Sequence, residues 1–177
     1  MSKVAQLHKR ASPISTGVYV LTCSTSKFKQ LQQKQQPDDE SGDIIERLAV
    51  NAGHKIAGRK LIADSRSMIR NAMRAALASR RVDVLVVTGG TGLSRTDVTF
   101  ETISPCLERE IPGFGEIFRR ISYDEIGSAA MMSRAFAGTI QGKAVFCLPG
   151  SPNGVKTAME KLILPELGHI IGLSRGS

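Results

Sequence analysis

The chain has 177 residues, of which 41% are hydrophobic and 23% are charged, so one globular domain with a substantial core is expected. No stretch approaches the roughly 20 apolar residues that a membrane-spanning helix needs. Residues 1–10 also lack the apolar centre of a secretory signal. These features predict a cytoplasmic protein with no membrane association.

Cysteine, histidine and charge patterns argue against two classes of site. The three cysteines and three histidines show no zinc-binding spacing, and the cysteines predict buried, reduced thiols. The net charge of +8 comes from residues 1–80, which hold 14 Lys and Arg against 6 Asp and Glu. These basic residues are dispersed and accompany no nucleic-acid-binding motif. A solvated face or a site for an anionic metabolite is therefore favoured over nucleic-acid binding, which is the weakest of the functions that the sequence suggests.

The first part of the chain predicts a leader, a strand, a loop and a helix. Residues 1–16 are polar and predict a flexible leader, and residues 17–23 predict a strand rich in β-forming side chains. Residues 24–40 are glutamine-rich and have no apolar period, which predicts a long polar loop. A helix with Ser41 as its N-cap is then expected to end near Gly53.

A second strand and helix follow. Residues 55–63 predict the strand, and Asp64 or Ser65 is expected to cap the next helix. That helix carries an arginine at every fourth position on its outer side, at Arg66, Arg70 and Arg74. The stripe predicts a solvated face or, as the weaker alternative, a surface that guides anions.

The second half of the chain predicts an α/β pattern around a buried strand. Residues 82–88 are a nearly continuous β-branched run, typical of a strand buried on both faces of a parallel sheet. The later segments are, in chain order, helices at 98–109, 116–126 and 133–138, a strand at 143–148, and a helix with Ser151 as its N-cap and Pro152 at its first position. Pro165 and Gly168 are expected to interrupt the tail. The alternation predicts one domain over residues 17–177, with a largely parallel sheet covered by helices on both faces.

Two tight turns follow predicted strands and predict a phosphate-binding site. They are Thr88-Gly-Gly-Thr-Gly92 and Pro149-Gly-Ser-Pro152. Glycines allow several backbone N–H groups to point at one anion, and ligands of parallel sheets bind beyond the carboxyl ends of the strands. The first turn is neither a dinucleotide-binding GxGxxG nor a Walker A loop, so taken alone it is weakly specific.

Two aspartates have two interpretations each, one beside the first turn and one at the end of a predicted strand. Asp97 lies in Arg95-Thr-Asp-Val-Thr99, where it could hold Mg²⁺ or cap the following helix, while Arg95 could pair with a phosphate. Asp64 ends a predicted strand in the same ambiguous way. From the local sequence, capping is the safer interpretation of Asp97, and capping explains Asp64 equally well.

Five motifs in register resemble the MoaB/MogA family of molybdenum-cofactor biosynthesis. They are Thr88–Gly92, Asp97-Val-Thr99 with Glu101, Glu110-Ile-Pro-Gly-Phe-Gly-Glu116, Ser133-Arg134-Ala135 and Pro149–Pro152, and they span about residues 17–170. Residues 121–127, Ile-Ser-Tyr-Asp-Glu-Ile-Gly, favour the MoaB branch. The resemblance implies a three-layer α/β sandwich that assembles as a homotrimer or homohexamer, and binding of molybdopterin.

In active members of that family, ATP with Mg²⁺ adenylylates the terminal phosphate of molybdopterin and releases pyrophosphate. The resemblance places the family's catalytic aspartates at Asp64 and Asp97, with either one a possible Mg²⁺ ligand. The substrate-binding positions that it implies are Ser24, Ser41, Gly42, Gly89, Gly90, Thr91, Gly92, Ser133, Arg134, Pro149, Gly150, Ser151 and Pro152.

The chain departs from the family pattern at two places. Phe100 stands where the family usually has proline, and residues 27–37 form an unusual glutamine-rich segment beside the expected nucleotide site. Some MoaB-type members have lost adenylylation. The alternative function is therefore a non-catalytic pterin-binding or assembly protein on the same fold, and the sequence leaves open whether the pathway uses molybdenum or tungsten.

Overall fold

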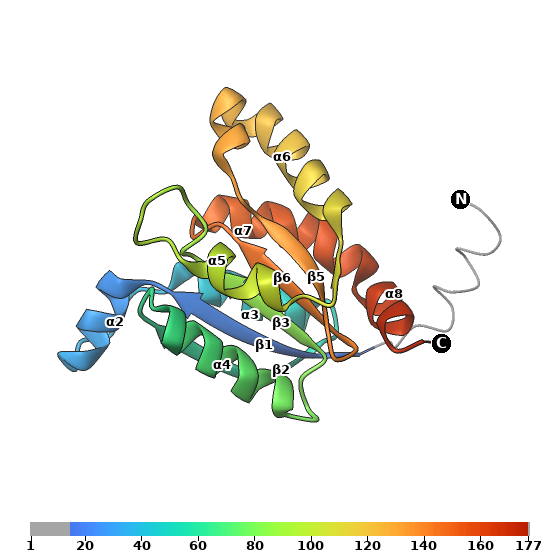
Figure 1. Cartoon of the computed structure of the whole chain (residues 1–177), viewed down its shortest axis with the longest axis horizontal. Coiled ribbons are helices and arrows are strands. Elements are labelled where there is room, and N and C mark those ends of the chain that lie inside the picture. Colours follow the sequence, from blue (N-terminus) through green and yellow to red (C-terminus); the bar gives the residue numbers. More distant parts are fainter. Residues whose placement is uncertain (1–14, 177) are drawn as a thin grey trace.

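The computed structural model describes residues 15–176 and contains one six-stranded sheet with the order β2-β1-β3-β6-β5-β4 (Figure 1). The predicted flexible leader lies outside the described residues except for Ser15 and Thr16. The strands are β1 (Gly17–Cys23), β2 (Lys55–Ile62), β3 (Val84–Thr88), β4 (Arg109–Glu110), β5 (Phe136–Ile140) and β6 (Lys143–Leu148). β1, β2, β3 and β6 run parallel, and β5 is antiparallel to both neighbours. The largely parallel sheet is confirmed.

Helices cover both faces of the sheet, which confirms the three-layer α/β class. On one face lie α3 (Glu40–Asn51), α6 (Pro112–Ile126), α7 (Pro152–Ala158) and α8 (Leu164–Ser174); on the other lie α4 (Arg66–Ala78) and α5 (Thr99–Ile103). Alternate residues of β3 supply the two cores, since Val84 and Val86 face the first group while Leu85 and Val87 face the second. Among residues 15–176, the helices are too short or too polar to cross a membrane.

Residues 25–32 form helix α2 (Thr25–Gln32), where a polar loop was predicted. Ser24 occupies the N-cap position and its hydroxyl accepts a hydrogen bond from the Lys27 amide at 3.4 Å. Lys and Gln are good helix formers, which allows this short helix without a core-facing stripe. The prediction was wrong because α2 buries none of its residues, so it lacks the apolar period used to recognise helices.

The prediction of a helix at 133–138 was also wrong. A 3₁₀ segment, η2 (Gly127–Met132), precedes that region, and strand β5 occupies its second half. Phe136 packs on one face of the sheet and Ala137 on the other, while antiparallel hydrogen bonding to β6 overrides the weak strand propensity of the Ala-Gly sequence. The predicted helix at 98–109 is likewise shorter, because α5 gives way to a 3₁₀ turn, η1 (Ser104–Cys106), at Pro105.

Three predicted helix boundaries differ in the structure. The N-cap of α3 is Asp39, which accepts from the Gly42 amide at 3.3 Å, so Ser41 lies within the first turn. Helix α6 begins at Pro112, four residues before the predicted start at 116. Pro165 does not interrupt the tail, because a wider π-helical turn, η3 (Met159–Ile163), joins α7 to α8 just before it. Gly168 lies inside α8.

The start of β1 is held by a histidine that must be neutral. The Thr16 amide donates to His54 Nδ1 at 3.3 Å, and the Thr16 hydroxyl lies 3.1 Å from the same nitrogen. Since that nitrogen accepts, the ring proton resides on the other nitrogen. Burial lowers the pKa of His54 below its ordinary 6.5. The neutral ring is thus the form that the fold favours.

Acidification is expected to weaken the fold through His54. With a lowered pKa in the folded state, the unfolded chain binds the proton first, so this contribution is complete above about pH 6.5 and is lost as the pH falls through the folded value. We expect His54→Gln, which does not titrate, to show a smaller fall in the free energy of unfolding between about pH 7.5 and pH 5.5. Denaturant unfolding at both pH values measures this, and an equal fall in both proteins would contradict it.

Candidate functional site

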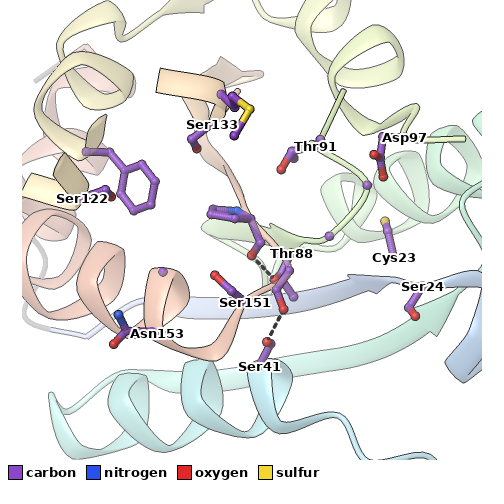
Figure 2. A pocket seen from close by; sticks show the side chains of 18 of the residues that line it. Cys23, Ser24, Ser41, Thr88, Thr91, Asp97, Ser122, Ser133, Ser151 and Asn153 are labelled. Carbon is purple, nitrogen blue, oxygen red and sulfur yellow. Dashed lines mark hydrogen bonds between the residues drawn. The ribbon is translucent and has the colours of Figure 1, made fainter. Parts of the chain in front are cut away.

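A cavity of about 690 Å³ lies at the carboxyl ends of β1, β3 and β6. This is where ligands of parallel sheets bind, and the volume lies within the range of small-molecule sites. Figure 2 shows polar side chains around it, with Asp97, Cys23 and Ser24 on one side and Ser122 and Asn153 on the other. The two predicted glycine-containing turns form much of the wall between them.

Hydrogen bonds join the two turns to each other. The Gly89 amide donates to the Leu148 carbonyl at 3.1 Å, and the Thr88 hydroxyl donates to the Pro149 carbonyl at 2.8 Å (Figure 2). On the far side of the second turn, the Ser41 hydroxyl donates to the Gly150 carbonyl at 2.9 Å. The turns therefore act as one rigid wall, tied to the start of α3.

The first turn requires glycine for steric reasons. Gly89 and Gly90 have φ angles of +93° and +64°. A Cβ on Gly89 would lie 2.1 Å from the Cys23 carbonyl oxygen, which is a backbone atom, and one on Gly90 would lie 2.4 Å from Thr99 Oγ1. This close packing brings the turn directly against the end of β1.

A row of backbone donors lies along the first turn. Within residues 15–176, no hydrogen bond engages the amide N–H groups of Gly90, Thr91, Gly92 and Leu93. Three of the four residues, Gly90, Thr91 and Gly92, line the cavity, and Thr91 is only 4% exposed. Consecutive free N–H groups in a glycine-rich turn provide the donors that an anionic oxygen needs.

Asp64 lies against this turn and does not cap helix α4. Its Oδ2 accepts from both the amide and the hydroxyl of Thr25, each at 2.8 Å, and its Oδ1 faces Gly90, where a Cβ would come within 2.8 Å. Ser65 occupies the N-cap position of α4 without a side-chain hydrogen bond to the helix. Of the two predicted capping residues, Ser65 is therefore the N-cap, and the capping interpretation was wrong for Asp64.

Asp97 contacts the other end of the turn. Its Oδ2 accepts from the Ser94 amide at 3.1 Å and would lie 2.7 Å from a Cβ on Gly92. The N-cap of α5 is Val98, so the capping interpretation was wrong here as well. Asp64 and Asp97 both line the cavity, one beside Gly90 and one beside Gly92.

Ten of the thirteen predicted substrate-binding residues line the cavity, and three do not. Gly42 packs against Arg59, since a Cβ there would lie 2.4 Å from its Nη2. Pro152 opens α7. Arg134 hydrogen-bonds to the backbone of the glycine turn, and Arg95 lines a smaller surface pocket outside the cavity. The cavity residues among the predicted set are Ser24, Ser41, Gly89, Gly90, Thr91, Gly92, Ser133, Pro149, Gly150 and Ser151.

Helix α6 and η2 contribute a wall of the cavity that the sequence motifs do not predict. Phe118, Ser122 and Glu125 line the cavity from one face of α6, at a spacing of four and three residues. Helical periodicity gave the available signal for this face, because these positions recur at one-turn intervals. The Glu125 carboxylate accepts from Asn153 Nδ2 and from the Thr157 hydroxyl, each at 3.0 Å, which joins α6 to α7.

Cys23 forms part of the cavity floor but is not a nucleophile. Burial, the main cause, raises the pKa of its thiol to about 12. A thiol with so high a pKa stays protonated at neutral pH and reacts poorly. Among the described residues there is no group of three or more His, Cys, Asp and Glu side chains that could hold a metal ion by themselves. Any metal ion in this site would therefore also need to be coordinated by oxygen atoms of the bound substrate.

Known proteins match nearly the whole chain. Residues 14–169 match the family model described as "Probable molybdopterin binding domain". "Molybdenum cofactor biosynthesis protein B" of Bacillus cereus is 43% identical over 164 residues, covering 92% of this chain and 93% of that protein. The "Probable molybdopterin adenylyltransferase" of Methanocaldococcus jannaschii is 39% identical over 166 residues, covering 94% of this chain and 97% of its own length.

Solved structures agree with the sequence matches. The tungsten cofactor synthesizing protein MoaB from Pyrococcus furiosus superimposes with a TM-score of 0.84 at 36% identity, covering 93% of this chain and 99% of that one. A crystal structure of a molybdenum cofactor biosynthesis protein B gives a TM-score of 0.85 at 42% identity, covering 94% and 99% of the two chains. Together with the matched domain, these similarities establish that the chain belongs to the MoaB family of molybdenum-cofactor biosynthesis proteins.

Proposed function

We propose that the protein transfers the adenylyl group of ATP to the terminal phosphate of molybdopterin and releases pyrophosphate. The observation that carries this proposal is the row of free amides at residues 90–93, set between the carboxylates of Asp64 and Asp97. The Methanocaldococcus jannaschii relative, with its name of probable molybdopterin adenylyltransferase, supports the same reaction.

The reaction is a phosphoryl-type displacement. An oxygen of the molybdopterin phosphate attacks the α-phosphorus of ATP, a new P–O–P bond forms, and the bond to the β-phosphate oxygen breaks with its electron pair leaving on pyrophosphate. Such a transfer requires no covalent protein intermediate, because alignment of the two phosphates and offset of their charge supply the rate. The amides of the glycine turn would bind phosphate oxygens, and the Ser151 hydroxyl would add a donor.

The residues present fit a Mg²⁺ ion shared with the nucleotide. Mg²⁺ in nucleotide sites is held by one or two carboxylates together with substrate phosphates and water. Asp64 and Asp97 supply that number of carboxylates, and each carries an oxygen toward the glycine turn. When bound, the ion would neutralise negative charge on the phosphates. The two aspartates would hold the ion and would thereby help to position the phosphates of the nucleotide.

The direct test is an assay with purified protein, molybdopterin, ATP and Mg²⁺, followed by detection of adenylylated product and pyrophosphate. We expect both products in equal amounts, and none when Mg²⁺ is chelated. Molybdopterin binding without ATP-dependent turnover would contradict the proposed reaction and would indicate the alternative, a non-catalytic pterin-binding or assembly protein.

We also propose that the protein acts in the cytoplasm as a homo-oligomer, a trimer or a hexamer. Helix α6 rises away from the sheet in Figure 1, and α6 with η2 exposes large apolar side chains that include Ile117, Tyr123 and Met131. Met131 is 78% exposed, and exposed apolar side chains that gather on one surface mark sites of contact with another protein. Burial against a second copy accounts for such a surface.

Sedimentation velocity is expected to show a species larger than the 19.1 kDa chain. Ile117→Glu combined with Met131→Glu should shift that species toward monomer, because two charges would enter the apolar contact. The double variant Arg120→Glu and Asp124→Lys, on the exposed ion pair of the same helix, is the control. A monomer in the native protein would contradict the proposal.

A further inference from the structure

Arg134 lies in the link between η2 and β5 and is fixed by five groups. Its Nε donates to the Thr91 carbonyl at 3.0 Å, and its Nη2 donates to the Gly92 carbonyl at 2.6 Å and lies 3.5 Å from the Asp97 carbonyl. Its Nη1 donates to the Glu101 carboxylate. The guanidinium carbon lies 5.1 Å from the centre of the Phe100 ring. Each of the three guanidinium nitrogens therefore donates to a group of the protein.

These contacts fix which way the glycine turn presents its donors. In a trans peptide the carbonyl of one residue and the amide N–H of the next point in opposite directions. Cis peptide bonds are absent from residues 15–176. Arg134 draws the Thr91 and Gly92 carbonyls to itself, so the N–H groups of Gly92 and Leu93 point away from it. Gly92 lines the cavity, whereas Leu93 and Arg134 line a smaller surface pocket beside it, and Asp97 lines both.

We propose that Arg134 is a positioning residue, which holds the two carbonyls so that the Gly92 and Leu93 amides bind an anionic phosphate oxygen and Asp97 keeps its place. This inference rests on the proposed function for the identity of the anion. It differs from the sequence interpretation, in which Arg134 touches the substrate. The arginine acts through the backbone of the turn, from the side opposite the ligand.

Two neighbours hold the guanidinium in place. The hydrogen bond from Arg134 is the main cause that lowers the pKa of Glu101, so that carboxylate stays ionised at neutral pH and anchors the fork. The Phe100 ring lies under the guanidinium and packs edge-on against Phe136, with ring centres 5.0 Å apart. Phe100 stands where the resemblance described above leads one to expect proline, and its ring adds a cation–π contact to the hydrogen bonds that hold the Arg134 guanidinium.

Three variants separate positioning from direct contact. Arg134→Lys keeps the charge, but one ammonium cannot reproduce the planar fork across two carbonyls. We expect it to lower both the affinity for inorganic pyrophosphate with Mg²⁺ and kcat/KM by about 100-fold. Glu101→Gln weakens the hold on the Arg134 guanidinium and should lower the pyrophosphate affinity and kcat/KM by a smaller factor. Arg120→Gln, on an exposed ion pair of α6, is the charge control and should change neither.

The outcome for Glu101→Gln decides between the two roles. If Arg134 bound the anion directly, removal of the competing carboxylate would raise pyrophosphate affinity, and that result would overturn the inference. Amide NMR supplies a readout that a purely structural role would not move. Pyrophosphate should shift the Gly92 and Leu93 amide signals in the native protein, and Arg134→Lys should lose those shifts while thermal unfolding remains cooperative.

The same measurements separate this inference from the proposed reaction. A native protein that binds pyrophosphate at the Gly92 and Leu93 amides without turning ATP over would contradict adenylyl transfer and leave the role of Arg134 intact. A native protein in which pyrophosphate shifts neither amide would overturn the positioning role, whatever its turnover. An Arg134→Lys variant with native affinity and native amide shifts would do the same.

Discussion

Asp97→Asn is expected to lower the turnover number for adenylyl transfer on the order of 1,000-fold while leaving the fold intact. The asparagine side chain keeps an oxygen that can accept from the Ser94 amide, which is the one side-chain hydrogen bond that Asp97 makes to its own loop at 3.1 Å. What the variant removes is a negative charge beside Gly92, where the Mg²⁺ of the proposed reaction would be held. Steady-state kinetics with thermal unfolding measures both halves of the expectation.

Asp124→Asn is the matched control for this charge loss. Asp124 is a 63%-exposed aspartate on α6 that pairs with Arg120 and lies outside the cavity lining. Surface ion pairs contribute about 0–1 kcal/mol, so its loss should change neither stability nor turnover appreciably. Turnover within a few-fold of native for Asp97→Asn would remove Asp97 from the proposed mechanism.

Gly89→Ala is expected to destabilise the fold by about 3 kcal/mol or more, because a backbone clash adds to an unfavourable φ angle. The added Cβ would lie 2.1 Å from the Cys23 carbonyl oxygen, and this oxygen belongs to β1, the strand that pairs with β3 inside the sheet. Relief of the clash requires β1 and β3 to separate at their carboxyl ends, where the cavity lies. Denaturant unfolding gives the loss of stability, and loss of pyrophosphate binding should accompany it.

Gly53→Ala isolates the contribution of the φ angle. Gly53 has φ of +87°, close to the +93° of Gly89, but a Cβ there would meet no atom within 4 Å. Its substitution should therefore cost only the left-handed conformation, about 1–2 kcal/mol. Similar losses for the two variants would show that the close approach of Gly89 to Cys23 contributes nothing.

Local signals in the sequence are sufficient to predict the central strand β3 and the glycine-containing turns. The apolar run of β3 and the glycines that follow it are contiguous, so their pattern predicts both a buried strand and a turn at its carboxyl end. The family resemblance alone assigns Asp64 and Asp97 to the site, because a capping role accounts for each of them from its neighbours in the sequence. The structure resolves that ambiguity through the contacts with Gly90 and Gly92.

The remaining features depend on long-range contacts that local patterns do not carry. The side of the turn that Arg134 occupies follows from the path of η2 and β5, 42 residues further along the chain than Gly92. β5 was mistaken for a helix because its pairing with β6 outweighs the propensity of its small residues. The face of α6 that lines the cavity carries no polar motif that would mark it as part of a site, because that face contains an aromatic ring.

Helix α2 has a consequence for how a ligand as large as a nucleotide reaches the cavity. It buries none of its residues, yet Ser24 at its N-cap and Lys27 in its first turn belong to the cavity wall. Local opening of a segment costs little free energy when the segment covers little apolar surface. Thr25, the first residue of α2, holds Asp64 through its amide and its hydroxyl. An outward movement of α2 would therefore free the Asp64 carboxylate without exposing the core. We expect ligand entry and release to accompany this local opening, which couples access to the cavity with the placement of Asp64 while the glycine turns stay in position.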